Sequence, residues 1–145
     1  MSNQPGSIPC VVHGASGATG QTPGMERKAA IDANAAGAQR VFMGRASAPP
    51  LSNSGAHHHG ESETAAYVVR GVVRVYFGEG YREFVEAREG DFLFVPANMA
   101  HVEVNPSPDQ PMEVILARGP DNTVVNLPDP VEHLTPVALE GAGAG

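Results

Sequence analysis

Residues 90–105 read GDFLFVPANMAHVEVN, and this stretch decides the fold. Residues 91–95 are a short, largely apolar run of the kind that forms a buried strand. Pro96 ends that strand, because proline has no N–H to donate to a β-ladder. His101 then opens a second strand, and Asn105 follows it. The stretch therefore predicts two strands joined by a turn, with a histidine where the chain returns.

The same alternation of short apolar runs and turns extends over most of the chain. We expect strands over residues 40–43, 64–70, 72–77, 81–87, 91–95 and 112–118, with glycine-containing turns at 78–80 and 88–90. The chain has 145 residues, which is enough for one hydrophobic core. Regularly spaced short strands in a single domain predict an all-β fold, either a β-sandwich or a small barrel.

Composition divides the chain into three parts. Residues 1–37 begin with a stretch rich in Gly, Ser, Thr and Pro, and we expect an N-terminal arm there with room for one short strand. Inside this arm, residues 25–36 have a composition that favours a helix. Residues 38–128 form the predicted barrel, and residues 129–145 form a C-terminal tail that ends in Gly and Ala.

Charge and cysteine content restrict the partners. Nine Lys and Arg face sixteen Asp and Glu, for a net charge of −7. We therefore expect neither nucleic acid nor a membrane surface as a partner. Cys10 is the single cysteine, so an intrachain disulfide and a thiolate metal cluster are both excluded. The first ten residues lack the features of a secretory signal, and we expect a cytoplasmic protein that acts on a small molecule.

Three consecutive histidines point to metal chemistry. Residues 55–64 read GAHHHGESET. On a strand, His57 and His59 share one face while His58 points to the other. Two such imidazoles can converge on one metal ion at about 2.0–2.1 Å each, and the hairpin geometry can aim His101 into the same interior. The alternative is a metal-free binding barrel in which the histidines serve as hydrogen-bonding or acid–base groups.

Both histidine stretches resemble motifs of the cupin family, a superfamily of jelly-roll metalloproteins. The second cupin motif, G(x)5P(x)4H(x)3N, is matched at Gly90, Pro96, His101 and Asn105. The first motif, G(x)5HxH(x)3–4E(x)6G, is matched at His57, His59 and Gly71. The resemblance covers about residues 38–126. It implies a jelly-roll β-sandwich or barrel in which His57, His59 and His101 bind a divalent metal.

The first motif departs from the family where its glutamate ligand is expected. Thr64 occupies that position, and the neighbouring Glu63 would face the opposite side of a regular strand. Either three histidines bind the metal alone, or a fourth ligand comes from elsewhere. His58 could turn inward at a backbone irregularity, and the arm could bring His13 to the site. Without the glutamate, the full charge of the dication would be left uncompensated, which strengthens it as a Lewis acid.

Small residues beside the histidines predict a cavity. Thr64 and Ala66 share the strand face that a ligand would use, and their size leaves room beside the metal. The large apolar residues available for its walls are Phe42, Met43, Phe92, Phe94 and Met99.

Further stretches resemble small cupin cyclases of bacterial aromatic polyketide pathways, at residues 24–27, 57–64 and 91–96. This resemblance implies a metal-dependent intramolecular aldol cyclisation and aromatisation of a poly-β-keto chain, whose 1,3-dicarbonyl units chelate divalent ions. We expect zinc, with iron, nickel and manganese as alternatives. The general base would be either metal-bound hydroxide or a spare imidazole such as that of His58.

Two other functions fit the same residues. A non-haem Fe(II) dioxygenase with three histidine ligands would bind a dicarbonyl or aromatic substrate together with oxygen. A non-catalytic cupin would use the barrel to bind a small ligand.

Exposed edge strands need cover, and cupins commonly dimerise through such an edge. The resemblance therefore also implies a homodimer, in which the N-terminal arm could supply the extra strand.

Overall fold

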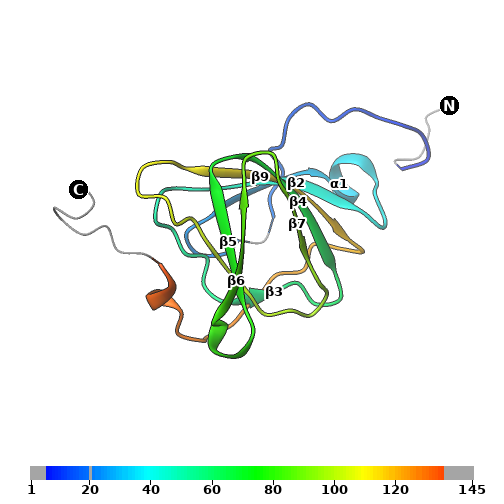
Figure 1. The fold of residues 1–145 in the computed structure, drawn as a ribbon. Coiled ribbons are helices and arrows are strands. Elements are labelled where there is room, and N and C mark those ends of the chain that lie inside the picture. The colour runs from blue at the N-terminus through cyan, green and yellow to red at the C-terminus, as the bar shows by residue number, and fades with distance from the viewer. Residues whose placement is uncertain (1–5, 20, 136–145) are drawn as a thin grey trace.

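The computed structural model describes residues 6–19 and 21–135, and its regular structure is mostly β-strand (Figure 1). The larger sheet has five strands in the order β1-β2-β9-β4-β7, and every neighbouring pair is antiparallel. These strands are β1 (Glu26–Ile31), β2 (Phe42–Ala48), β9 (Met112–Gly119), β4 (Glu63–Arg70) and β7 (Phe92–Val95).

The remaining strands form the facing layer. One three-stranded sheet has the order β6-β5-β8, and a short pair consists of β10 and β3. These strands are β6 (Glu83–Arg88), β5 (Val72–Phe77), β8 (Val102–Val104), β10 (Val125–Asn126) and β3 (His57–His58). Backbone bridges from Asn53 to Val104 and from His57 to His101 join the two pieces. The layers wrap around a common interior (Figure 1), which confirms the predicted all-β jelly roll.

Alternating burial along the strands builds the core. In β9, the side chains of Met112, Val114 and Leu116 point inward, and in β4 those of Ala66 and Val68 do so. They pack against Val73, Val75 and Ala87 of the other layer in one cluster. The two-residue period predicted from the sequence is therefore confirmed. The same period also places two polar side chains, Thr64 and Arg118, on the inner face.

The N-terminal part contributes a strand where the composition favours a helix. Residues 26–31 form β1, and only α1 (Ala33–Ala36) is helical. Asp32 caps this helix, since its Oδ1 accepts a hydrogen bond from the Ala35 N–H at 2.7 Å. The helix expectation is wrong for 26–31 because Arg27 and Ala29 alternate inward against β2, and pairing with that strand outweighs helix propensity. The short 3-10 helices are η1 (Glu79–Tyr81) and η2 (Glu132–Leu134).

Two motif residues have structural roles that the fold explains. Asn105 is buried, donates to the carbonyls of Pro49 and Gln110, and accepts from the Ser107 N–H, so it ties three backbone segments together. Gly71 has φ of 78°, and a Cβ there would lie 2.4 Å from the Pro111 carbonyl oxygen. The backbone at residue 71 therefore requires glycine.

The apolar residues expected to wall the cavity divide between the two faces of the sheet. Phe42 is buried and Met99 packs against the core, whereas Met43 and Phe94 are exposed and Phe92 is 82% exposed. In β7 the inward positions belong to Leu93 and Val95 instead, because Phe92 and Phe94 occupy the alternate register. Within residues 6–19 and 21–135, no helix combines the length and apolar character needed to cross a membrane.

Candidate metal centre

A single cross-strand pair brings together two histidines that are distant in the sequence. His57 and His101 exchange both backbone hydrogen bonds, at 3.0 and 2.9 Å. Residues paired in this way project their side chains to the same face of the sheet, and the two ring centroids lie 4.3 Å apart. The convergence predicted from the strand–turn–strand stretch thus follows from the register of one bridge.

His59 completes the group from two residues further along the chain. Its ring centroid lies 5.0 Å from that of His57 and 5.3 Å from that of His101. One ring nitrogen from each histidine lies within 4.8 Å of the others, and all three residues are buried. We call His57, His59 and His101 the histidine triad.

Backbone carbonyls fix the tautomer of each triad ring. The Nδ1 atoms of His57, His59 and His101 lie 3.1, 2.7 and 2.9 Å from the carbonyl oxygens of Gly55, Thr123 and Met99. A carbonyl can only accept, so each Nδ1 carries the hydrogen and donates it. The lone pair of a ring then lies on its Nε2 atom, and Arg27 Nη2 lies 3.5 Å from the Nε2 atom of His57. Metal-binding histidines are held in this way, so the triad fits a divalent cation.

Electrostatics keep the rings of His59 and His101 neutral at ordinary pH. Burial lowers the pKa of His59 to about 3, and the charge of Arg118 contributes. Burial also lowers the pKa of His101 to about 4, with a further contribution from His57. A metal ion therefore does not have to displace a proton from either ring at neutral pH.

A carboxylate that the sequence analysis did not single out lies beside the triad. Glu103 Oε2 is 3.4 Å from His57 Nε2 and 3.3 Å from the Nη2 atom of the buried Arg27. Burial alone would raise the pKa of Glu103, but the contact with His57 and the charge of Arg27 bring it well below its usual range. An ionised carboxylate facing a ring nitrogen is a suitable fourth donor to a cation.

Arg118 lies beside Thr64, which occupies the position of the motif's glutamate. Thr64 and Arg118 are cross-strand partners, and Arg118 Nε donates to Thr64 Oγ1 at 2.7 Å. Its Nη1 donates to the Asn122 side-chain oxygen. Burial lowers the pKa of Arg118 to about 10, and repulsion from Arg27 contributes. The guanidinium group remains charged at neutral pH.

These side chains line one small space, the inner cavity. Its volume is about 10 Å³, which is close to the room needed for one water molecule. As predicted, Thr64 and Ala66 contribute to its wall. The complete lining is His59, Thr64, Ala66, Val73, Leu93, Val95, His101, Glu103, Val114, Leu116 and Arg118.

The other predicted site residues lie apart from the triad. His58 is half-buried, and its Nδ1 accepts a hydrogen bond from the Gly60 N–H at 3.0 Å. It is therefore the opposite neutral tautomer to the triad rings. His13 is exposed in the N-terminal segment. Neither belongs to the metal-type group found among the described residues, so their roles as fourth ligand, or as base for His58, stay predictions.

Sequence reasoning missed Arg27, Glu103 and Arg118. A signal for Glu103 was present, because it stands two residues after His101 and so shares its strand face. Arg118 likewise continues the inward period of Met112, Val114 and Leu116. Arg27 had no comparable signal, since its position depends on the pairing of β1 with β2.

The family follows from this fold and the sequence together. The family profile described as Cupin domain matches residues 44–118, more than half of the chain, and the chain belongs to the cupin family. No curated protein matches the sequence at a significant level.

Solved structures extend the likeness beyond the matched segment. The polyketide cyclase RemF from Streptomyces resistomycificus aligns with a TM-score of 0.67 and 20% identity, covering 86% of this chain and 89% of that chain. Oxalate decarboxylase from Bacillus subtilis aligns with a TM-score of 0.66 and 17% identity, covering 84% and 33%. An oxalate oxidase aligns with a TM-score of 0.62 and 19% identity, covering 78% and 60%. The predicted resemblance to cupins, and to a cupin-type polyketide cyclase among them, is confirmed as a likeness of fold.

Proposed function

We propose that this protein is a metal-dependent enzyme that cyclises a poly-β-keto chain by intramolecular aldol condensation. The observation that carries the proposal is the histidine triad, in which every Nδ1–H is bound to a backbone carbonyl. Support for the particular reaction comes from the fold shared with the polyketide cyclase RemF over 86% of the chain.

The metal would be held by His57, His59 and His101, with Glu103 as our proposed fourth ligand. A bound divalent ion supplies Lewis-acid polarisation of the two oxygens of a 1,3-dicarbonyl unit. Zinc is the metal we propose, because an aldol condensation needs no redox change. Iron, nickel and manganese are the alternatives, since imidazole and carboxylate donors accept each of them.

The chain itself would orient the substrate and exclude water. Val114 and Leu116 give the inner cavity apolar walls, which favour a folded carbon chain over hydrated carbonyl groups. Holding the reacting carbons close together supplies the entropic advantage of an intramolecular reaction. At about 10 Å³ the cavity admits only a small group, so the walls must move apart before a longer chain enters.

A base must remove a proton from the carbon between two carbonyls. His58 is the candidate proposed from sequence, and to act it must first release the Gly60 N–H that its Nδ1 accepts. His58 and His13 likewise stay as alternatives to Glu103 for the fourth ligand.

A second candidate function is a three-histidine Fe(II) dioxygenase. The observation that favours it is the same triad of neutral imidazoles, which suits iron as well as zinc. Its reaction consumes oxygen, whereas an aldol condensation does not. A non-catalytic binding role is the third alternative, and it predicts neither a cyclised nor an oxygenated product.

One experiment separates the three functions. The protein is purified without added metal, its metal content is measured by elemental analysis, and it is incubated with a synthetic poly-β-keto acid. We expect a product lighter by one water, detected by mass spectrometry, with no oxygen uptake in an oxygen electrode. His101→Ala should abolish the product. Oxygen uptake would favour the dioxygenase, and an equal yield from the chelator-treated enzyme would overturn metal dependence.

We also propose that the protein is a homodimer. β7 is an edge strand of the larger sheet, and its outward side chains Phe92 and Phe94 are 82% and 58% exposed. Tyr67 packs against Phe92 and extends this apolar face. A second copy of the chain is the occupant we propose, because the apolar area and the open strand edge lie together on one side. The other edge strand is β1, and backbone hydrogen bonds between Gly17 and Ala29 cover part of it within the same chain.

A further inference from the structure

Arg118 carries a buried charge that no acidic group neutralises directly. Its side chain lies inside the barrel with the residue 4% exposed. Its hydrogen-bond partners are the hydroxyl of Thr64 and the amide oxygen of Asn122, and both are neutral. Within the part of the chain that the structure describes, Arg118 forms no salt bridge. A buried guanidinium group without an anionic partner is costly, so it favours binding of an anion.

The charges around Arg118 also favour the binding of an anion. Arg27 is also buried, with 5% of its surface exposed. Its Nε and Nη1 atoms have no hydrogen-bond partner among the described residues. Glu103 is the one carboxylate in the lining of the inner cavity, and Arg27 already pairs with it. The acidic neighbours of the two guanidinium groups are Glu103, which pairs with Arg27, and Asp121, which acts on Arg118 without forming a salt bridge. A divalent cation on the triad would add further positive charge. An anionic ligand would restore the balance.

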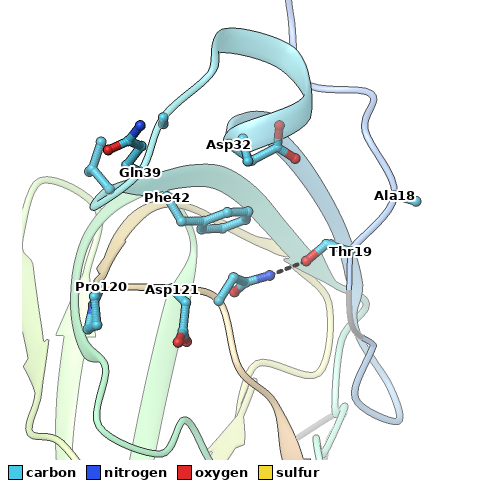
Figure 2. A pocket seen from close by; sticks show the side chains of 11 residues that line it. Ala18, Thr19, Asp32, Gln39, Phe42, Pro120 and Asp121 are labelled. Carbon is cyan, nitrogen blue, oxygen red and sulfur yellow. Dashed lines mark hydrogen bonds between the residues drawn. The ribbon is translucent and has the colours of Figure 1, made fainter. Parts of the chain in front are cut away.

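A larger hollow, the outer pocket, is lined by Asn122, the hydrogen-bond partner of Arg118. Figure 2 shows Thr19, Asp32, Phe42 and Asp121 around it, and its volume is about 300 Å³. Asn122 lines this pocket, accepts from Arg118 Nη1 and donates to Thr19 Oγ1. The hydrogen bonds from Arg118 through Asn122 to Thr19 therefore connect a residue that lines the inner cavity with two residues that line the outer pocket.

From this geometry we infer that Arg118 is a substrate anchor that binds a carboxylate of the substrate, with Asn122 giving way as the carboxylate arrives. The larger part of the substrate would occupy the outer pocket. The inference rests on the proposed function for the 1,3-dicarbonyl unit at the triad, and it narrows the substrate class to β-keto acids. A carboxylate oxygen at Arg118 gains a charge-assisted hydrogen bond that neither Thr64 nor Asn122 can supply.

The test compares two small probes. Malonate, a dicarboxylate, reports on Arg118, and acetylacetone, a neutral 1,3-diketone, reports on the metal-loaded triad. Binding is measured by isothermal titration calorimetry on the metal-free and zinc-loaded protein. For Arg118→Gln we expect the malonate affinity of the metal-free protein to fall about tenfold or more. Acetylacetone binding to the zinc form should stay within about twofold, and Arg82→Gln, at an exposed arginine, should bind both probes as the wild type does.

A second variant keeps the inference testable if Arg118→Gln does not fold. Asn122→Asp keeps the shape of the side chain and places a carboxylate on Arg118 Nη1, so it should remove malonate binding while circular dichroism stays unchanged. Malonate binding that survives in Asn122→Asp or Arg118→Gln would overturn the anchor. Loss of acetylacetone binding in the zinc-loaded wild type would instead contradict the proposed dicarbonyl chemistry and leave the anion site standing.

Discussion

Thr64 and Arg118 are cross-strand neighbours on the inner face, joined by a hydrogen bond of 2.7 Å from the guanidinium Nε to the threonine hydroxyl. Thr64 occupies the position where the cupin motif has its glutamate ligand. A glutamate there would supply a negative charge to both the metal and the arginine, and threonine supplies none. The threonine at position 64 and the lack of a salt bridge to Arg118 among the described residues therefore have one consequence. The positive charge of the site is left for the substrate to balance.

Restoring the glutamate tests this relationship. In Thr64→Glu, the new carboxylate should pair with Arg118 and also add a donor beside the triad. We expect zinc affinity to rise about tenfold and malonate affinity to fall about tenfold, both measured by calorimetry. Thr64→Val is the matched control, because it keeps the shape and removes only the hydroxyl. If zinc affinity in Thr64→Glu equals that of Thr64→Val, position 64 does not reach the metal.

Metal content distinguishes the triad from its neighbour His58. We expect bound zinc to fall well below one equivalent per chain in each of His57→Ala, His59→Ala and His101→Ala, because each variant loses one of the imidazole donors. His58→Ala should keep the full equivalent. Elemental analysis after dialysis against a weak chelator measures this. Loss of zinc in His58→Ala with an unchanged circular dichroism spectrum would make His58 the fourth ligand in place of Glu103.

The strand pattern and the triad were predictable because both depend on local periodicity. His57 and His59 share a face by the two-residue period, and the spacing from Gly90 to Asn105 placed His101 at a hairpin return. The bridge from His57 to His101 is a long-range pairing, which the hairpin geometry allowed and the cupin resemblance implied. Arg27 reaches Glu103 from β1, so their contact depends on a register between distant segments that no local pattern encodes. Phe92 and Leu93 show the same limit, since a run of apolar residues does not say which of them faces inward.

Breaking the buried ion pair of Arg27 and Glu103 should destabilise the metal-free protein. Arg27→Met leaves Glu103 without its partner and should lower the free energy of unfolding by about 3–5 kcal/mol. The double variant Arg27→Met/Glu103→Leu removes both charges and should recover most of that loss. Chemical denaturation of metal-free samples measures each value. Equal losses in the single and double variants would show that packing of the arginine stem, rather than charge, carries the effect.

The proposed dimer predicts a specific response at β7. Phe92→Glu and Phe94→Glu together place two negative charges on the exposed edge strand, and in a symmetric contact they would face like charges. Sedimentation velocity at micromolar concentration should change from dimer to monomer. Phe84→Glu, on β6, is the control, because it adds a charge at another exposed phenylalanine. A wild type that sediments as a monomer would refute the dimer directly.

Tyr81 predicts a stability change at alkaline pH. Its hydroxyl donates to Asp129 Oδ2 at 2.5 Å and so attaches the C-terminal segment to the barrel. Burial, with the contribution of Asp129, raises the pKa of Tyr81 to about 12. In the unfolded chain the phenol titrates near pH 10, so between pH 10 and pH 12 the unfolded state loses its proton first and gains relative stability. The stabilisation is therefore complete below about pH 10 and declines by about 1.4 kcal/mol per pH unit above it. Phenylalanine cannot titrate, so Tyr81→Phe is the control. The difference in unfolding free energy between the wild type and Tyr81→Phe should be constant from pH 8 to pH 9 and shrink by pH 11. A difference that stays constant over the whole range would mean that the hydroxyl is not held by Asp129.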